Sequence, residues 1–185
     1  MRRLLNRLKD CGYKIAVAES CTGGLISKMI TDLPGASEVF DLAVTTYSNE
    51  MKTKLLGVKP ETLAEFGAVS NQTAQEMASG VLAVANADIA VAVTGIAGPS
   101  NAGTEKPVGT VCIGVATKEK CYATTFVFAG SRRQIRQMSA KMALHMVFDE
   151  LGISVKRIKK ERAITKKAGS AVKKTKKALD KLRNR

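Results

Sequence analysis

The sequence is poor in aromatic residues, which make up 4% of its 185 residues and include no tryptophan. A surface that stacks on the bases of single-stranded nucleic acid is therefore poorly supported. Long apolar runs are also absent, because the longest such stretch, residues 81–93, is interrupted by Asn86 and Asp88. A membrane-spanning helix is not expected from this pattern. Residues 1–14 are basic but lack the apolar core of a secretion signal, so we expect a cytoplasmic protein.

Residues that commonly bind metals are scarce and badly spaced for a shared site. His145 is the only histidine, and the four cysteines (Cys11, Cys21, Cys112 and Cys121) contain no Cys-x-x-Cys pair. A four-ligand zinc site of ordinary spacing is therefore not expected. Without a secretion signal, free thiols in a reducing compartment are the default.

The positive charge is concentrated at one end of the chain. The 30 basic and 16 acidic residues give a net charge of +14. Residues 156–185 hold 14 basic and two acidic residues, a net of +12, whereas residues 1–155 carry only +2. We therefore predict one near-neutral domain over residues 1–152, large enough for a real core, and a Lys-rich basic tail over residues 153–185. The tail has low complexity and no continuous apolar stripe, which favours disorder or a helix formed on contact with a partner.

Strand-like and helix-like segments alternate along the predicted domain. Strands are expected at residues 14–18, 42–46 and 89–94, and helices at residues 25–31, 49–56 and 72–85. Residues 108–116 and 121–128 have the character of a hairpin, and residues 131–151 that of a long final helix. This order predicts an α/β domain with α/β/α layers, a mixed and mostly parallel sheet, and a C-terminal antiparallel hairpin.

Small polar residues follow three of the predicted strands, at residues 19–24, 47–52 and 94–98. In this fold class, sites gather at the carboxyl ends of strands. Ser20 precedes a helix that begins near Gly23 and Gly24, where free N–H groups suit a nucleophile with an oxyanion hole or a phosphate site. The alternative is that Ser20 and Thr22 only cap the helix. Cys21 is a rival nucleophile, although a small buried thiol is its simpler interpretation.

A serine nucleophile needs a base, and Lys52 is a better candidate for that base than His145, the only histidine. His145 falls within the predicted final helix, so a Ser-His-Asp arrangement is not expected. Lys52 lies in the first turn of a predicted helix, where the helix dipole disfavours an ammonium and partial burial would lower its pKa. A solvated surface lysine is the alternative interpretation. Arg132 and Arg136 lie at the start of the final helix, where the helix dipole also disfavours cations. Arginines in this position are explained either by an anionic ligand that they bind or by ordinary surface charge.

Five motifs in this order and spacing resemble the CinA C-terminal domain family, the nicotinamide-nucleotide amidohydrolases of bacteria. They are residues 18–24 (AESCTGG), 47–52 (YSNEMK), 67–70 (GAVS), 93–99 (VTGIAGP) and 105–110 (EKPVGT). The resemblance covers residues 1–152. Many family members carry a further N-terminal domain similar to molybdopterin-binding proteins, so the resemblance implies a stand-alone form here.

The resemblance implies hydrolysis of nicotinamide mononucleotide to nicotinate mononucleotide and ammonia, with no cofactor or metal. It implies Ser20 as nucleophile, Lys52 as base and Arg132 as a phosphate ligand. The other residues that it places at the substrate are Thr22, Gly23, Gly24, Tyr47, Asn49, Thr94 and Gly95. It also implies a homodimer or higher homo-oligomer. Two departures from the family pattern are Ser131, in place of an acidic residue, and Asn101-Ala102, in place of a glycine pair.

A second hypothesis concerns the tail. The domain could be a catalytically inactive family member that binds nucleic acid nonspecifically through residues 156–185. Such binding would weaken steeply with salt, because it would depend on phosphate contacts alone. The five intact motifs argue against lost activity.

Overall fold

The computed structural model describes residues 1–101 and 103–152. Residue 102, one half of the Asn101-Ala102 departure, and the predicted tail over residues 153–185 lie outside the described part. The strands are β1 (Ile15–Glu19), β2 (Phe40–Thr45), β3 (Ile89–Gly95), β4 (Thr110–Thr117) and β5 (Cys121–Val127). The helices are α1 (Arg2–Cys11), α2 (Leu25–Thr31), α3 (Asn49–Leu56), α4 (Pro60–Phe66), α5 (Asn71–Val84), the short 3-10 helix η1 (Ala36–Glu38), and a C-terminal helix over residues 132–152.

One mixed sheet has the strand order β2-β1-β3-β4-β5. β1 pairs in parallel with β2 and β3, whereas β4 pairs antiparallel with β3 and β5. β4 is thus the one described strand that runs against the others. The predicted α/β class, the mostly parallel sheet and the C-terminal hairpin are confirmed. The second strand begins two residues earlier than the predicted residue 42.

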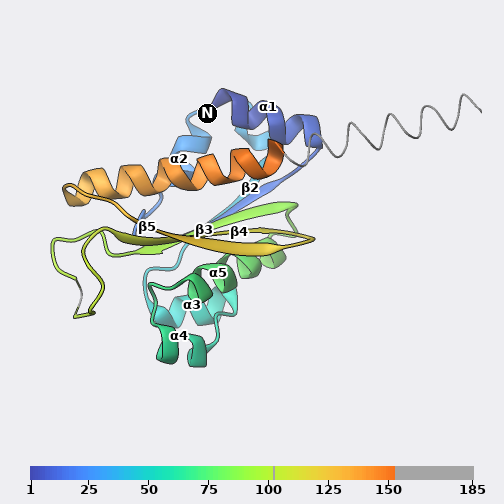
Figure 1. The fold of residues 1–185 in the computed structure, drawn as a ribbon. Helices are drawn as coiled ribbons and strands as arrows, with labels where there is room; N and C mark the ends of the chain where they lie inside the picture. The colour runs from blue at the N-terminus through green and yellow to red at the C-terminus, as the bar shows by residue number, and fades with distance from the viewer. Residues whose placement is uncertain (102, 153–185) are drawn as a thin grey trace, which may run out of the picture.

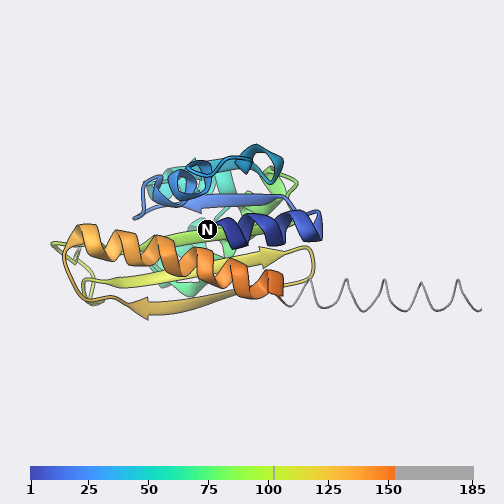
Figure 2. The same cartoon turned by 90° about the horizontal axis from the view of Figure 1, so that it is seen from above.

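Helices cover both faces of the sheet, giving the predicted α/β/α layers. In Figures 1 and 2, α1, α2 and the C-terminal helix lie on one face, and α3, α4 and α5 lie on the other. Among the described residues, no helix is long and apolar enough to cross a membrane.

The sequence of the strands explains how a layer of helices packs on each face of the sheet. In β1, Ile15 and Val17 belong to the core cluster under α1, α2 and the C-terminal helix, whereas Ala16 and Ala18 face the cluster under α5. Because side chains alternate between faces, the strand presents bulky residues to one layer and alanines to the other. The alanine face lets α5 lie close to the sheet, so that a Cβ on Gly114 of β4 would collide with the Ala74 carbonyl of α5.

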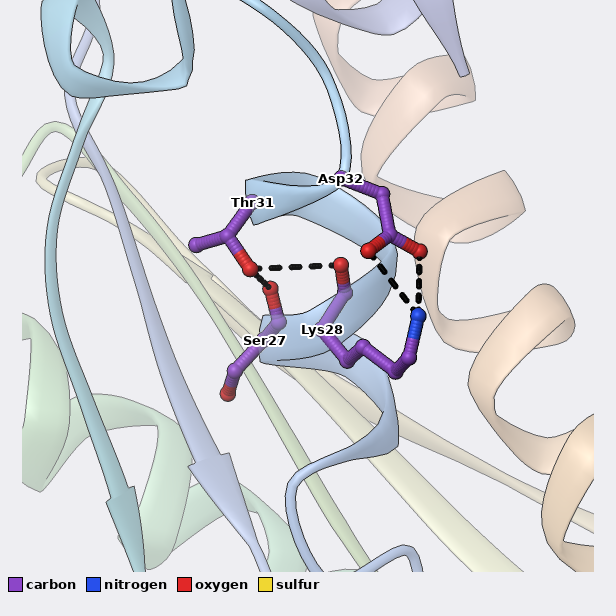
Figure 3. A network of polar contacts seen from close by, with 4 residues as sticks. All are labelled: Ser27, Lys28, Thr31 and Asp32. Carbon is purple, nitrogen blue, oxygen red and sulfur yellow. Dashed lines mark hydrogen bonds and ion pairs between the residues drawn. The ribbon is translucent and has the colours of Figure 1, made fainter.

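Capping and surface pairs define the ends of the helices. The Ser48 hydroxyl accepts from Met51 N at the start of α3, and Ser70 does the same for Thr73 N at the start of α5. On the exposed side of α2, Lys28 Nζ pairs with Asp32 at 2.7 Å (Figure 3). The two serine caps thus define where α3 and α5 begin.

Candidate active site

A cavity of about 480 Å³ opens at the carboxyl ends of β1 and β3. It lies where the three predicted polar clusters meet. The predicted site residues that line it are Ser20, Tyr47, Asn49, Lys52, Thr94, Gly95 and Arg132. The topology therefore brings together residues that are more than a hundred positions apart in sequence. Their roles toward a ligand remain predictions.

Ser20 and Lys52 are in direct contact inside this cavity. Lys52 Nζ lies 3.2 Å from Ser20 Oγ. It also donates to the carbonyl oxygens of Thr46 at 2.9 Å and Tyr47 at 3.3 Å. Ser20 continues directly from β1, and its N–H donates to Val93 O of β3, so the sheet fixes its position.

Lys52 is not a solvated surface lysine. Its side chain is 1% exposed, whereas Lys54 in the same helix is exposed. Its three hydrogen-bond partners are uncharged oxygens, and no described carboxylate contacts it. Burial therefore lowers the pKa of the Lys52 ammonium below its ordinary value. An amine with a lowered pKa is suited to accept a proton.

Cys21 is the weaker nucleophile in this environment. It is buried beside Ser20, and this burial raises the pKa of its thiol to about 12. The thiol is therefore neutral near pH 7, and only a thiolate is a good sulfur nucleophile. A neutral Cys21 also has little effect on the pKa of Lys52. The geometry favours Ser20.

The N-terminus of α2 does not offer free N–H groups, so that prediction is wrong. The Glu19 carboxylate, which is fully buried, accepts from Gly24 N at 2.9 Å, Ile26 N at 3.2 Å and Ser27 N at 2.9 Å. Ser27 Oγ donates to it as well, at 2.5 Å. Glu19 therefore occupies the position that an external anion would need.

Thr22, Gly23 and Gly24 lie outside the lining of the cavity. Thr22 is buried, and the Gly24 N–H is used by Glu19. Gly24 has φ 91°, a conformation that glycine adopts without strain, and this permits the tight turn from Ser20 into α2. These three residues form the turn between Ser20 and α2.

The backbone N–H of Gly95, at the end of β3, is directed toward β1 and Ser20. The N–H and C=O of Ile96 both bond to the β4 side, to Thr110 O and Gly109 N. Successive residues of a strand direct these groups to opposite edges, so the Gly95 N–H points toward β1 and Ser20. A Cβ on Gly95 would lie 2.7 Å from Val111 Cγ2, which explains why glycine is needed there.

Arg132 lines the cavity as predicted, whereas Arg136 binds the backbone of the turn between Ser20 and α2. Arg132 donates to Gly98 O at 2.8 Å and to the Tyr47 hydroxyl at 3.1 Å. Arg136 donates to the carbonyls of Cys21 at 3.1 Å and Thr22 at 2.6 Å. The guanidinium of Arg136 is thus used inside the protein.

The two departures from the family pattern have local structural roles. Ser131 and Gln134 form reciprocal hydrogen bonds at the start of the C-terminal helix, as in a capping box. Of the second departure only Asn101 is described, and its side-chain amide donates to Thr104 O at 2.6 Å. His145 is exposed, pairs with Asp149 and does not line the cavity with Ser20, so it is not the base.

The sequence does not predict the roles of two residues near the site. Glu19 lies outside the cavity lining, and a buried carboxylate that caps the helix after its own strand has no distinctive spacing. Lys106 lines the cavity, and the motif at residues 105–110 was the signal that marked it. In the part of the chain that the structure describes, no three His, Cys, Asp or Glu side chains are grouped to hold a metal.

Comparison with known proteins shows the family of the chain. The sequence profile of the CinA C-terminal domain matches residues 1–151. The chain belongs to the CinA C-terminal domain family. A CinA-like protein of Chloroherpeton thalassium is 50% identical over 151 residues, which cover 80% of this chain and 36% of that protein. A protein of Caldanaerobacter subterraneus subsp. tengcongensis, provisionally named competence-damage inducible, is 52% identical over 144 residues, 78% of this chain and 35% of that protein.

Solved structures of the CinA family share the fold. The competence/damage inducible protein CihA from Agrobacterium tumefaciens has 41% identity and a TM-score of 0.78, over 82% of this chain and 92% of that chain. Competence damage-inducible protein A from Klebsiella pneumoniae has 34% identity and a TM-score of 0.80, over 82% and 94%. The chain spans about a third of the length of the curated CinA relatives that it matches.

Proposed function

We propose that the chain is an amidohydrolase that converts nicotinamide mononucleotide to nicotinate mononucleotide and ammonia. The observation that carries the proposal is the buried contact between Lys52 Nζ and Ser20 Oγ, 3.2 Å apart in the cavity. Family membership supports it, because the motifs that carry the resemblance supply these two residues. The reaction would run in the cytoplasm as part of pyridine-nucleotide salvage.

The partners of Lys52 suit a neutral amine that acts as a general base. The carbonyls of Thr46 and Tyr47 can only accept hydrogen bonds, so they take two N–H groups. In the neutral amine this leaves the lone pair directed at Ser20 Oγ. Lys52 then removes the Ser20 proton as Oγ attacks the carboxamide carbon.

The tetrahedral intermediate carries an oxyanion that needs donors. Since Glu19 occupies the N–H groups of α2, the Gly95 N–H is the donor that we assign to it. One such donor typically contributes about 3 kcal/mol to transition-state stabilisation. Lys52, now protonated, gives its proton to the amide nitrogen, which leaves as ammonia. The neutral Lys52 then takes a proton from the water that attacks the acyl-enzyme and returns it to Ser20 Oγ as nicotinate mononucleotide is released.

The charge of the cavity favours an anionic substrate. Lys106 and Arg132 line it as cations beside Lys52, which is neutral in the proposed mechanism, and no described lining residue is acidic. A mononucleotide carries a phosphate that such a cavity attracts, whereas its pyridinium amide is the group to be cleaved. The Arg132 guanidinium, at the exposed edge beside Tyr47, is our proposed phosphate ligand.

The test is ammonia release from nicotinamide mononucleotide by the wild-type chain and by Ser20→Ala. We expect turnover by the wild type and a loss on the order of 10⁴-fold or more in the variant, with the fold unchanged by circular dichroism. Cys112→Ala, at a buried position outside the cavity, is the matched control. Near-normal turnover by Ser20→Ala would exclude the serine mechanism.

We also propose a homodimer or higher homo-oligomer, in line with the family resemblance. Sedimentation equilibrium measures it directly. A mass equal to that of one 19.7 kDa chain over the whole concentration range would refute the proposal.

A further inference from the structure

Lys106 is a cavity lysine whose charge has no acidic hydrogen-bond partner among the described residues. Its side chain is half-buried, and Nζ donates to Phe66 O at 3.1 Å and Val69 O at 2.5 Å. Both acceptors are neutral backbone carbonyls, one at the last residue of α4 and one in the segment that joins α4 to α5. They account for two of the three N–H bonds of the ammonium, so one donor is left for a ligand.

This bonding pattern differs from that of the paired surface lysines. Lys9 bonds to Glu38, Lys28 to Asp32, and Lys118 to Asp88, all at 2.7–2.8 Å. Surface ammonium groups of this chain are thus commonly neutralised by a nearby carboxylate. The ammonium of Lys106 instead adds an uncompensated positive charge to a cavity that has no acidic lining residue among those described.

We propose that Lys106 is a specificity-determining residue that binds the phosphate of the substrate together with Arg132. The inference rests on the proposed function and names a second cation for the same substrate group. Arg132 is anchored on Gly98 and Tyr47, and Lys106 on residues 66–69, so two separate segments hold cations at one cavity. Two such anchors select a phosphorylated substrate over its nucleoside, because a charge-assisted hydrogen bond to phosphate is strong in a partly buried site.

A purely structural role is the competing explanation. Lys106 joins the loop before β4 to the segment at residues 66–69, and Thr94 Oγ1 joins Ala68 O to β3 at 2.7 Å. If Lys106 only latched this wall of the cavity, its loss would impair every substrate equally. The phosphate therefore has to be the variable in the experiment.

The experiment compares nicotinamide mononucleotide with nicotinamide riboside, which lacks the phosphate, in the wild type, Lys106→Met, Lys106→Arg and Arg133→Met. We expect Lys106→Met to lower kcat/KM for the mononucleotide about 10- to 100-fold, mainly through KM, and to leave the riboside nearly unchanged. Lys106→Arg should retain most of the preference. Arg133, an exposed arginine outside the cavity, is the matched control for loss of charge. Equal losses on both substrates would overturn the proposal.

Binding of ribose 5-phosphate, measured by calorimetry, separates this inference from the proposed function. Wild type should bind it at least 10-fold more tightly than Lys106→Met, whether or not any amide is hydrolysed. If the wild type lacked deamidase activity but showed this difference, the function would fail and the phosphate site would stand. Equal affinity of both proteins in this assay would refute the role of Lys106, even in an active enzyme.

Discussion

Replacing Lys52 with methionine should remove activity at almost no cost in stability. Methionine is similar in length and fills the same buried space. The change leaves the carbonyls of Thr46 and Tyr47 without their donor, at about 1–3 kcal/mol for each carbonyl that water does not reach. It also removes a buried charge, whose desolvation costs several kcal/mol. The two effects oppose each other, so the free energy of unfolding should change by less than about 2 kcal/mol.

The stability difference should depend on pH in a defined direction. Because burial lowers the pKa of Lys52 in the folded state, the unfolded chain binds more protons between that pKa and the ordinary value of 10.5. The wild type therefore gains stability as pH rises through this window, and Lys52→Met does not. Relative to the variant, the wild type should be least stable below the lowered pKa. Urea denaturation at a series of pH values measures this.

Activity is the second half of the same prediction. Loss of a general base typically lowers the rate by about 10²- to 10⁴-fold, and the wild-type rate should rise with pH as Lys52 loses its proton. Lys54→Met, at an exposed position of the same helix, should keep both rate and pH profile. Deamidase activity of Lys52→Met within tenfold of wild type, or a loss of unfolding free energy above about 2 kcal/mol, would refute the reasoning.

Three further outcomes are expected. Glu19→Gln should lower the free energy of unfolding by about 2–4 kcal/mol in urea titrations, because two oxygens that accept four hydrogen bonds become one, and exposed Glu50→Gln is its control. Gly95→Ala should lower turnover at least tenfold, since its Cβ would lie 2.7 Å from Val111 Cγ2; an unchanged rate would contradict the assigned oxyanion donor. The full chain should bind DNA with an affinity that falls steeply with salt, and a chain ending at Gly152 should lose that binding but keep deamidase activity.

The sheet and its layers could be predicted because the strands have a strong pattern. β1 and β3 alternate bulky residues with alanine, and turn residues separate them from the helices. The order of the elements then limits the topology to a few arrangements. The exact beginning of β2 was harder, because its burial is partial along its length and gives a weaker signal.

The site was predictable where it depends on strand ends and not where it depends on side-chain direction. Ser20 and Lys52 follow neighbouring strands, so topology alone brings them near each other. That the Glu19 carboxylate accepts hydrogen bonds from α2 could not be predicted from the sequence, because the backbone conformation at Gly24 decides which N–H groups of the helix are already used. Arg132 and Arg136 have the same chemistry and neighbouring positions, and only the fold separates a cavity residue from a structural one.

The placement of Glu19 also bears on the proposed role of Lys52 as a base. These two buried ionisable residues lie close to Ser20 and have opposite charge. A direct ion pair between them would stabilise the ammonium and raise its pKa, and Lys52 would then hold its proton near neutral pH. The hydrogen bonds from α2 hold the Glu19 carboxylate instead, while Lys52 contacts only uncharged oxygens. Alternation along β1 places the Glu19 side chain on the α2 face of the sheet with Ile15 and Val17, whereas Lys52 belongs to α3 on the other face. In the proposed mechanism the sheet therefore separates this carboxylate from the base.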